Sequence, residues 1–325
     1  MERSSKIFRR SIHTFLNNYH FFTSTAALLA LPFSVSFLLS QSFVPSSPSP
    51  LLPTIHARLR ALFDAAGFPP SSQFFSILCL KLSQTISSFF VTLPCSLTFL
   101  LISKASVILS LSQHKLSLPF SSFLQTYKPL LLTYVSNLLV ILSANATATA
   151  LAVLFFAFKS LGGPWFDSPS LQLFFPAFGP ILYSIILAHA LIVCNFALVL
   201  SGTEKFGGFE AILKACVLIR DSIPVALSLA IPMNLGWAAV EALFQYRVVR
   251  AYRVTKAPSF AVALEGLFIA YLYSILIVLD TIVSCIFFKS CKRMNDLLCH
   301  EDGYSCRIEF AEDPEDPERV PKSES

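Results

Sequence analysis

The chain is poor in charge and in glycine. Asp, Glu, Lys and Arg together make up 13% of its 325 residues, whereas a soluble protein has roughly 25%. Only ten glycines are present, and the pairs at 162–163 and 207–208 lack the surrounding pattern of a phosphate-binding loop. The net charge of +5 is small and scattered, so nucleic acid is not an expected partner. Composition therefore argues against a soluble nucleotide-using enzyme and against a nucleic-acid-binding protein.

Clusters of metal-ligating or catalytic side chains are also missing from the sequence. The six histidines are scattered, and the one inside an apolar run, His189, has no carboxylate three or four residues away. The spacing of Cys291, Cys299, His300 and Cys306 is not that of a zinc finger. The eight cysteines form no closely spaced, even set of the kind that staples a secreted domain. We therefore expect no cofactor, no metal and no enzymatic activity.

What the sequence does contain is six long apolar runs. Each reaches the roughly 20 residues that a membrane span needs, and the mean hydropathy of the chain is +0.66. Backbone groups inside hydrocarbon need internal partners, so the runs are expected to be helices. The sequence thus predicts an all-α polytopic membrane protein with about six transmembrane helices. The runs lie at 21–44, 74–102, 130–158, 171–200, 223–244 and 260–288.

The expected organisation has three parts. Residues 1–20 form a basic amphipathic segment, residues 21–289 a six-helix transmembrane domain, and residues 290–325 an acidic, disordered tail. Two more segments, 120–127 and 209–219, repeat apolar side chains at helical spacing among charged ones, which is typical of short helices in the membrane interface. The chain is then expected to form three units, each an interfacial helix, an outward span and a return span.

The start of the chain allows other interpretations. Arg9 and Arg10 before an apolar run are typical of a secretory signal, and a start rich in Ser and Arg is typical of a transit peptide. The apolar run is longer than the roughly 7–15 residues of a signal core, and no small-x-small cleavage site follows it. We therefore expect an uncleaved first span.

The distribution of Lys and Arg predicts the orientation. With the N-terminus in the cytosol, most of the cations between the runs, Lys104 among them, fall on the cytosolic side, as the positive-inside rule requires. The segment from Arg247 to Lys256 is the exception, because its four cations fall on the opposite side. Both termini are expected to be cytosolic, and the endoplasmic reticulum or another endomembrane is the expected location.

Four ionisable residues lie within the expected spans, namely Asp280, Glu265, Glu241 and Lys81. Such groups are costly in hydrocarbon and are therefore candidate functional residues. Asp280 is the deepest carboxylate, and the sequence offers it no deep basic partner. It is expected either to be a proton or cation site of a transporter or to be held structurally against a neighbouring helix. Lys81 is at a depth that allows pairing with Glu241 or Glu265.

Cys291 follows the last apolar run and is flanked by Lys289, Lys292 and Arg293. A cysteine beside a span and among cations is a candidate for S-acylation. The alternative is an ordinary free thiol.

Three stretches carry a resemblance, namely Ser11–Phe15 with Leu31–Ser34, Lys115–Ser122, and Phe206–Lys214. They resemble motifs of a plant family of poorly characterised multi-pass membrane proteins. The likeness covers about residues 5–290 and departs from the family pattern at Arg220-Asp221, where the family has a Lys-Gly turn. The chain is similar, more distantly, to bacterial membrane domains built from interfacial helices and span pairs. The resemblance implies an architecture and no established activity.

Two hypotheses for function follow. The first is a non-enzymatic membrane-organising or interaction protein, whose interfacial helices contact membrane lipids and whose acidic tail meets a cytosolic protein partner. The alternative is a small-solute or lipid transporter that uses Asp280. A polar cavity reaching Asp280 would favour transport, and a closed, tightly packed bundle would argue against it.

Overall fold

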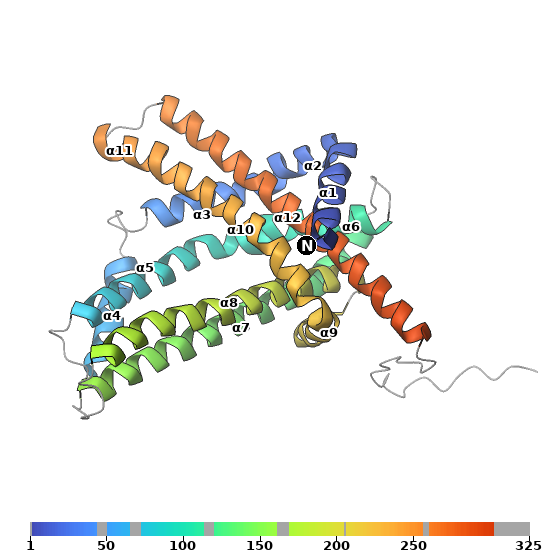
Figure 1. Ribbon diagram of the computed structural model, residues 1–325. Helices are drawn as coiled ribbons and strands as arrows, with labels where there is room; N and C mark the ends of the chain where they lie inside the picture. Colours follow the sequence, from blue (N-terminus) through green and yellow to red (C-terminus); the bar gives the residue numbers. More distant parts are fainter. Residues whose placement is uncertain are drawn as a thin grey trace, which may run out of the picture.

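The computed structural model of the chain is built from helices (Figure 1). It describes residues 2–43, 51–65, 73–113, 120–160, 169–204, 206–255 and 260–301, and no strand occurs within these ranges. Six helical stretches are long and apolar enough to cross a membrane, which confirms the predicted all-α fold with about six transmembrane helices. These stretches are Tyr19–Gln41, Ser76–Ser112, Leu124–Leu151, Tyr183–Glu204, Ile223–Tyr252 and Phe260–Asn295.

The helices follow one another as three consecutive pairs of spans with short helices between them. The first pair consists of α2 (Tyr19–Thr25), the π-helical turn η1 (Ala26–Ala30) and α3 (Leu31–Phe43), followed by α5 (Gln73–Cys95), the π-helical turn η3 (Ser96–Leu100) and α6 (Leu101–Gln113). The second pair is α7 (Phe120–Ser160) and α8 (Pro169–Glu204). The third consists of α10 (Ile223–Phe244), the π-helical turn η6 (Gln245–Val249) and α11 (Arg250–Thr255), followed by α12 (Phe260–Glu301). The short helices are α1 (Glu2–Asn17), α4 (Leu51–Ala65), α9 (Phe209–Ile219) and the 3-10 turn η5 (Arg220–Ser222).

The three pairs fan apart from a common base (Figure 1). Helices α1 and α9 and the last turns of α12 lie around that base, which we call the convergent end. Helix α4 lies beside α5 at the opposite, divergent end. Helix α12 runs through the middle and packs against α1, α3, α6, α8 and α10. This arrangement makes α12 the element through which the three pairs are joined.

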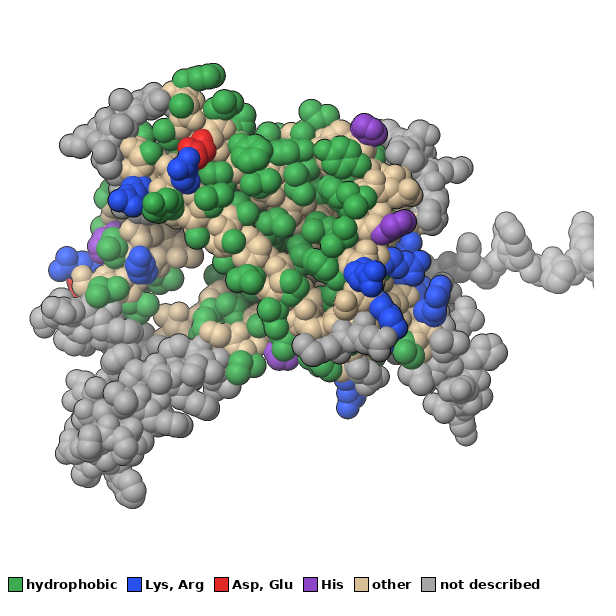
Figure 2. Space-filling view, turned by 45° about the horizontal axis from the view of Figure 1, so that its top comes forward, with side chains coloured by type: hydrophobic (Ala, Val, Ile, Leu, Met, Phe, Trp, Pro, Cys, Tyr) green, Lys and Arg blue, Asp and Glu red, His purple; other side chains and the backbone are tan. Residues whose placement is uncertain are grey.

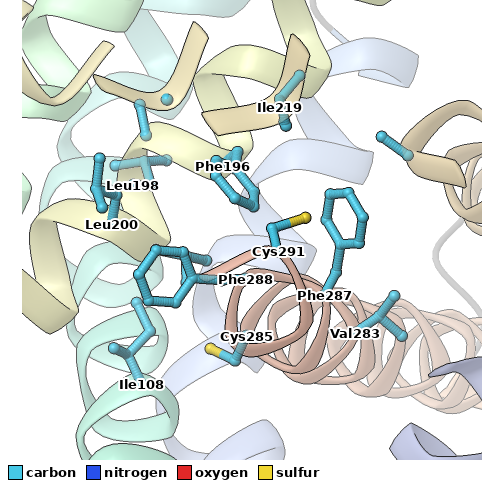
Figure 3. Close-up of a cluster of buried hydrophobic side chains, with 14 of the residues drawn as sticks. Ile108, Phe196, Leu198, Leu200, Ile219, Val283, Cys285, Phe287, Phe288 and Cys291 are labelled. Atoms are coloured by element: carbon cyan, nitrogen blue, oxygen red, sulfur yellow. The ribbon is translucent and has the colours of Figure 1, made fainter. Parts of the chain in front are cut away.

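The largest buried apolar cluster lies at the convergent end. Here α1, α9 and spans from all three pairs meet over α12, whose Phe287 and Phe288 project toward Phe196 of α8 (Figure 3). The ring of Phe196 makes edge-on contacts with both, at centroid distances of 5.5 Å and 5.6 Å. Close packing of this kind supports a fixed arrangement of the helices at this end.

The prolines within the spans do not unwind them. Pro32 lies two residues after the end of η1 and Pro94 two residues before the start of η3, so a wider π-helical turn lies close to each of these prolines. Helix α8 is continuous through Pro176 and Pro180. These prolines are therefore tolerated within helices, as is common in membrane spans.

Two of the three predicted interfacial helices are separate elements in the structure. Residues 1–20 contain α1, and residues 209–219 form α9. The prediction for residues 120–127 was wrong, because they form the first turns of α7, which continues without interruption through Pro129. Nothing between 120 and 130 ends the helix, and the apolar stretch of the third span begins inside this segment, at Leu124.

The turn before α9 is fixed by two glycines. Gly208 has a φ of 75°, and its N–H donates to the hydroxyl oxygen of Thr133 on α7 at 3.0 Å. A Cβ on Gly207 would lie 3.1 Å from the backbone Cα of Pro129. The motif Phe206–Lys214 is thus a close backbone contact between α7 and the start of α9.

Helix α12 extends past the expected start of the tail at residue 290 and ends at Glu301. Residues 302–325, which carry most of the acidic tail, lie outside the described residues. So do residues 114–119, which open the motif Lys115–Ser122.

Candidate functional site

A pocket lies among the spans where α8 and α10 converge on α12, beside Ile219 of α9. Its cavity volume is about 60 Å³, which is room for a small polar group, and it is partly open to the surroundings. Asp280 is one of its lining residues, so the cavity reaches the deepest carboxylate predicted from the sequence. The lining residues are Ile192, Asn195, Phe196, Ile219, Ala226, Leu229, Ala230, Met233, Asp280, Val283, Ser284 and Phe287.

Three of these lining side chains are polar, and helical spacing brings them together. Asp280 and Ser284 are four residues apart on α12, so they lie on the same face one turn from each other. Asn195 faces them from α8. All three are partly buried, and none makes a side-chain hydrogen bond or ion pair within the described part of the chain. Because water is scarce in hydrocarbon, such groups gain from any bound molecule that offers partners.

The remaining walls of the pocket are apolar. Phe196 and Phe287 belong to the cluster in Figure 3, where the two rings come from α8 and α12 and meet edge to face at 64°. Leu229 and Met233 of α10 are buried on the opposite wall. A few polar groups in an otherwise apolar hollow are typical of a small-molecule site. The arrangement matches a ligand with one polar group and an apolar body.

Lys104 is a basic residue within the spans that interacts electrostatically with Asp280, and the sequence analysis missed this role. It lies on α6, within the second membrane span, rather than in a connection at the cytosolic side. Val107, one turn further along α6, is buried against Val278 and Ile282, which flank Asp280 on α12. The two helices run toward the same end, since Lys289 of α12 donates to the carbonyl oxygen of Leu111 on α6 at 2.7 Å.

Lys104 and Asp280 therefore sit level with each other and interact electrostatically. No ion pair or hydrogen bond joins them directly among the described contacts. The sequence analysis expected no deep basic residue for Asp280, and Lys104 is such a residue, although it makes no direct bond to the carboxylate. The continued apolar pattern after Lys104, through Val107, Ile108 and Leu109, is the sequence feature that could have revealed it, because it extends the second span beyond residue 102.

The other predicted ionisable residues lie away from this pocket. Glu265 accepts from the guanidinium of Arg247 at 2.5 Å, and Glu241 accepts from the hydroxyl of Tyr273 at 3.4 Å. Lys81 is exposed on α5 and forms no ion pair among the described residues. Lys81 therefore does not pair with Glu241 or Glu265, because these two carboxylates bind Tyr273 and Arg247 instead.

The contact of Arg247 with Glu265 also bears on the cations that break the positive-inside pattern. Arg247 and Arg250 lie on η6 and α11, which continue the fifth span, and Arg250 packs over the ring of Tyr246 at 5.4 Å. One of these cations is offset by a carboxylate and another by an aromatic ring, which lowers the cost of placing them at the divergent end. Lys256 lies outside the described residues.

Cys291 is buried, with 3% of its surface exposed, in the cluster at the convergent end. Its thiol does not offer an accessible site for S-acylation in this conformation. Cys216, on the outer face of α9, is exposed. Partial burial nevertheless raises the pKa of the Cys216 thiol.

The surface in Figure 2 shows where charge and apolar side chains gather. Apolar side chains cover the middle of this face, and Lys and Arg side chains lie toward its two sides. This distribution fits a band in contact with hydrocarbon between two interfaces. No group of three His, Cys, Asp or Glu side chains that could hold a metal occurs among the residues that were placed.

Comparison with known proteins identifies a family without naming an activity. No curated protein and no solved structure matches the chain. One family does match, over residues 4–297, and it is described as a domain of unknown function, DUF8558. The match spans all six transmembrane stretches and the pocket. The chain, an apolar six-helix membrane protein, belongs to the DUF8558 family.

Proposed function

We propose that this protein binds a small amphiphile in the pocket at Asp280 and moves it within or across the bilayer. One observation carries the proposal, namely that Asp280, Asn195 and Ser284 converge, without hydrogen-bond partners among the described residues, on a pocket inside the spans. Unpaired polar groups at this depth are costly unless a ligand or water meets them. The presence of this cavity favours the transporter hypothesis over the membrane-organising one.

The position of the pocket supports entry from the bilayer. All of its lining residues except Ile219 of α9 belong to α8, α10 and α12, which are spans. We therefore propose that a ligand dissolved in the membrane enters between these helices. A purely water-soluble solute is a poorer match, because most of the lining is apolar.

A flux measurement tests the proposal. The full chain is reconstituted in vesicles, and transbilayer movement of fluorescent lipids with several head groups is followed by chemical quenching of the outer leaflet. We expect Asp280→Asn to slow the movement of the transported lipid by about tenfold or more, the equivalent of one lost charge-assisted hydrogen bond. Glu241→Gln is the matched control, because this carboxylate also lies in a span but does not line the pocket.

A second pair of variants tests the pocket independently of charge. Ala230 lines the pocket on α10, so Ala230→Leu fills it, whereas Ala239→Leu makes the same change on an exposed face of the same helix. We expect only Ala230→Leu to abolish flux. Equal flux in all four variants and the unaltered protein, or no flux and no ligand bound in the pocket, would refute the proposal.

A membrane-organising role remains the second candidate, and the short helices favour it. Helix α1 packs on α12 through Ile7 and Ser11, while Arg9, Arg10 and Ile12 on its other side are exposed. Cations and apolar side chains on one exposed helix face are suited to an anionic membrane surface. Reshaping of anionic vesicles by the protein, lost when Arg9 and Arg10 are replaced by Ser, would support this role.

The remaining assignments are proposals of the same kind. We expect a non-enzymatic protein of the endoplasmic reticulum or another endomembrane, from a plant, with both termini in the cytosol and an acidic tail that meets a protein partner. Co-purification of the same partners from cells, abolished by deletion of residues 302–325, tests the role of the tail.

A further inference from the structure

We infer that the pocket selects an amphiphile with an uncharged, hydroxyl-bearing head group, because Lys104 balances the charge of Asp280. The inference rests on the proposed function, since it concerns the ligand of the same pocket. It names the chemistry that an alcohol, a sterol and a diacylglycerol share. Lipids with a fixed positive or negative charge are the classes that it rejects.

The polar groups of the pocket can both donate and accept hydrogen bonds. The carboxyl group of Asp280 and the hydroxyl group of Ser284 lie one helical turn apart, and the amide group of Asn195 faces them. The amide both donates and accepts, and the hydroxyl does the same. A ligand hydroxyl, which also donates and accepts, can be satisfied by any two of these groups. A head group that only accepts, such as a sulfate, would leave the carboxylate unpaired.

The charges nearest the pocket cancel. Asp280 interacts electrostatically with Lys104, and Val107 packed against Val278 and Ile282 holds the two helices in that register. The pair sums to zero whether the proton sits on the amine or on the carboxyl group. Lys104 does not line the pocket, so it acts as a positioning residue that sets the potential there without touching the ligand.

A charged head group would find no free counter-charge in the pocket. Glu241, the carboxylate of α10, accepts a hydrogen bond from Tyr273 and does not line the pocket. No Arg or Lys that the structure describes lines the pocket either. A cationic or anionic head group in this pocket would therefore have no counter-charge beyond one already engaged. Uncompensated charge is strongly disfavoured at this depth, whereas an uncharged hydroxyl pays no such cost.

The experiment uses three hexadecyl probes that carry the same photoreactive group in the chain. The head groups are a hydroxyl, a trimethylammonium and a sulfate, whose charges do not depend on pH. The full-length protein in lipid nanodiscs is labelled at low probe content, and labelled peptides from α8, α10 and α12 are quantified. We expect the alcohol to label the pocket at least about tenfold more than either charged probe.

Substitution of Lys104 and substitution of Asp280 should shift the probe preference in opposite directions. Lys104→Met leaves the carboxylate of Asp280 unbalanced and should raise labelling by the cationic probe relative to the alcohol by about tenfold. Asp280→Asn leaves the amine of Lys104 unbalanced and should raise labelling by the sulfate in the same way. The double variant should restore the preference for the alcohol. Such a restoration would also show that neither substitution prevents folding.

Asn195→Leu and Ser284→Ala complete the test, because they remove hydrogen-bonding groups without altering charge. Both should lower labelling by the alcohol and leave the ratio of the two charged probes unchanged. Preferential labelling of the unaltered protein by a charged probe, or single variants with unchanged ratios, would overturn the inference while leaving a ligand-binding pocket in place. Absence of pocket labelling by all three probes would instead count against the proposed function.

Discussion

Lys104 of α6 lies level with Asp280 of α12, on two spans that run toward the same end of the molecule and share the buried contact of Val107 with Val278 and Ile282. Each residue alone would place an unbalanced charge among membrane helices, and together they sum to zero. The pair therefore places compensating charges on a span of the first pair and a span of the third, and of the two only Asp280 lines the pocket.

Removal of one member should cost more than removal of both. We expect Lys104→Met or Asp280→Asn to lower the free energy of unfolding by on the order of 2 kcal/mol, less than a directly bonded buried pair would lose because the two groups are not in contact. The double variant should be closer to the unaltered protein than the sum of the single changes. Unfolding midpoints in a detergent titration measure all four states, and strictly additive losses would contradict the electrostatic coupling.

The turn before α9 gives a prediction about backbone conformation. Gly208 has a positive φ, which a side chain disfavours, so Gly208→Ala should lower stability by about 1–2 kcal/mol. Gly236 on α10 is the control, because an added Cβ there meets only Leu276 side-chain atoms at 3.6 Å. Gly236→Ala should be neutral or stabilising, since alanine is favoured over glycine in a helix. The same unfolding titration measures both, and equal effects would argue against the conformational explanation.

The spans could be predicted from composition alone, since length and hydropathy decide which segments lie in hydrocarbon. The charge-bearing site could not. Lys104 was assigned to a connection because an apolar run interrupted by a lysine looks like the end of a span, and only its packing against α12 places it inside. Asn195 and Ser284 cannot be singled out in a sequence this rich in polar residues such as Ser. Their role depends on lying near Asp280 in the folded protein, Ser284 one turn along α12 and Asn195 on α8.

The sequence pattern also gave a wrong prediction for residues 120–127, which it assigned to a separate interfacial helix. Their amphipathic spacing is shared by an interfacial helix and by the first turns of a span, and the continuation of α7 through Pro129 distinguishes them. The burial of Cys291 was equally invisible in sequence, since its cationic neighbours point elsewhere: Lys292 pairs with Glu204 at 2.6 Å.

The orientation of the fifth span can be checked by cysteine labelling. Cys216 on α9 lies at the convergent end and Arg250 toward the divergent end of the same half of the chain, and both are exposed. In protein whose other cysteines are replaced by alanine, a membrane-impermeant maleimide should reach Cys216 and the Arg250→Cys thiol from opposite sides of sealed vesicles. Labelling of both from one side would contradict six complete spans.

The thiols of Cys216 and Cys291 should differ in rate and in pH dependence. Only the thiolate reacts with a maleimide, and burial raises the pKa of Cys216, so less thiolate is present at neutral pH than in a free cysteine. Alkylation of Cys216 should therefore be slower than that of free cysteine at pH 7 to 8 and should keep rising toward higher pH. Cys291, with 3% of its surface exposed, should react only after unfolding. Mass spectrometry of variants that retain a single cysteine measures both rates. Fast alkylation of Cys291 in the folded protein would show that the convergent end opens, and would restore that thiol as a candidate for S-acylation.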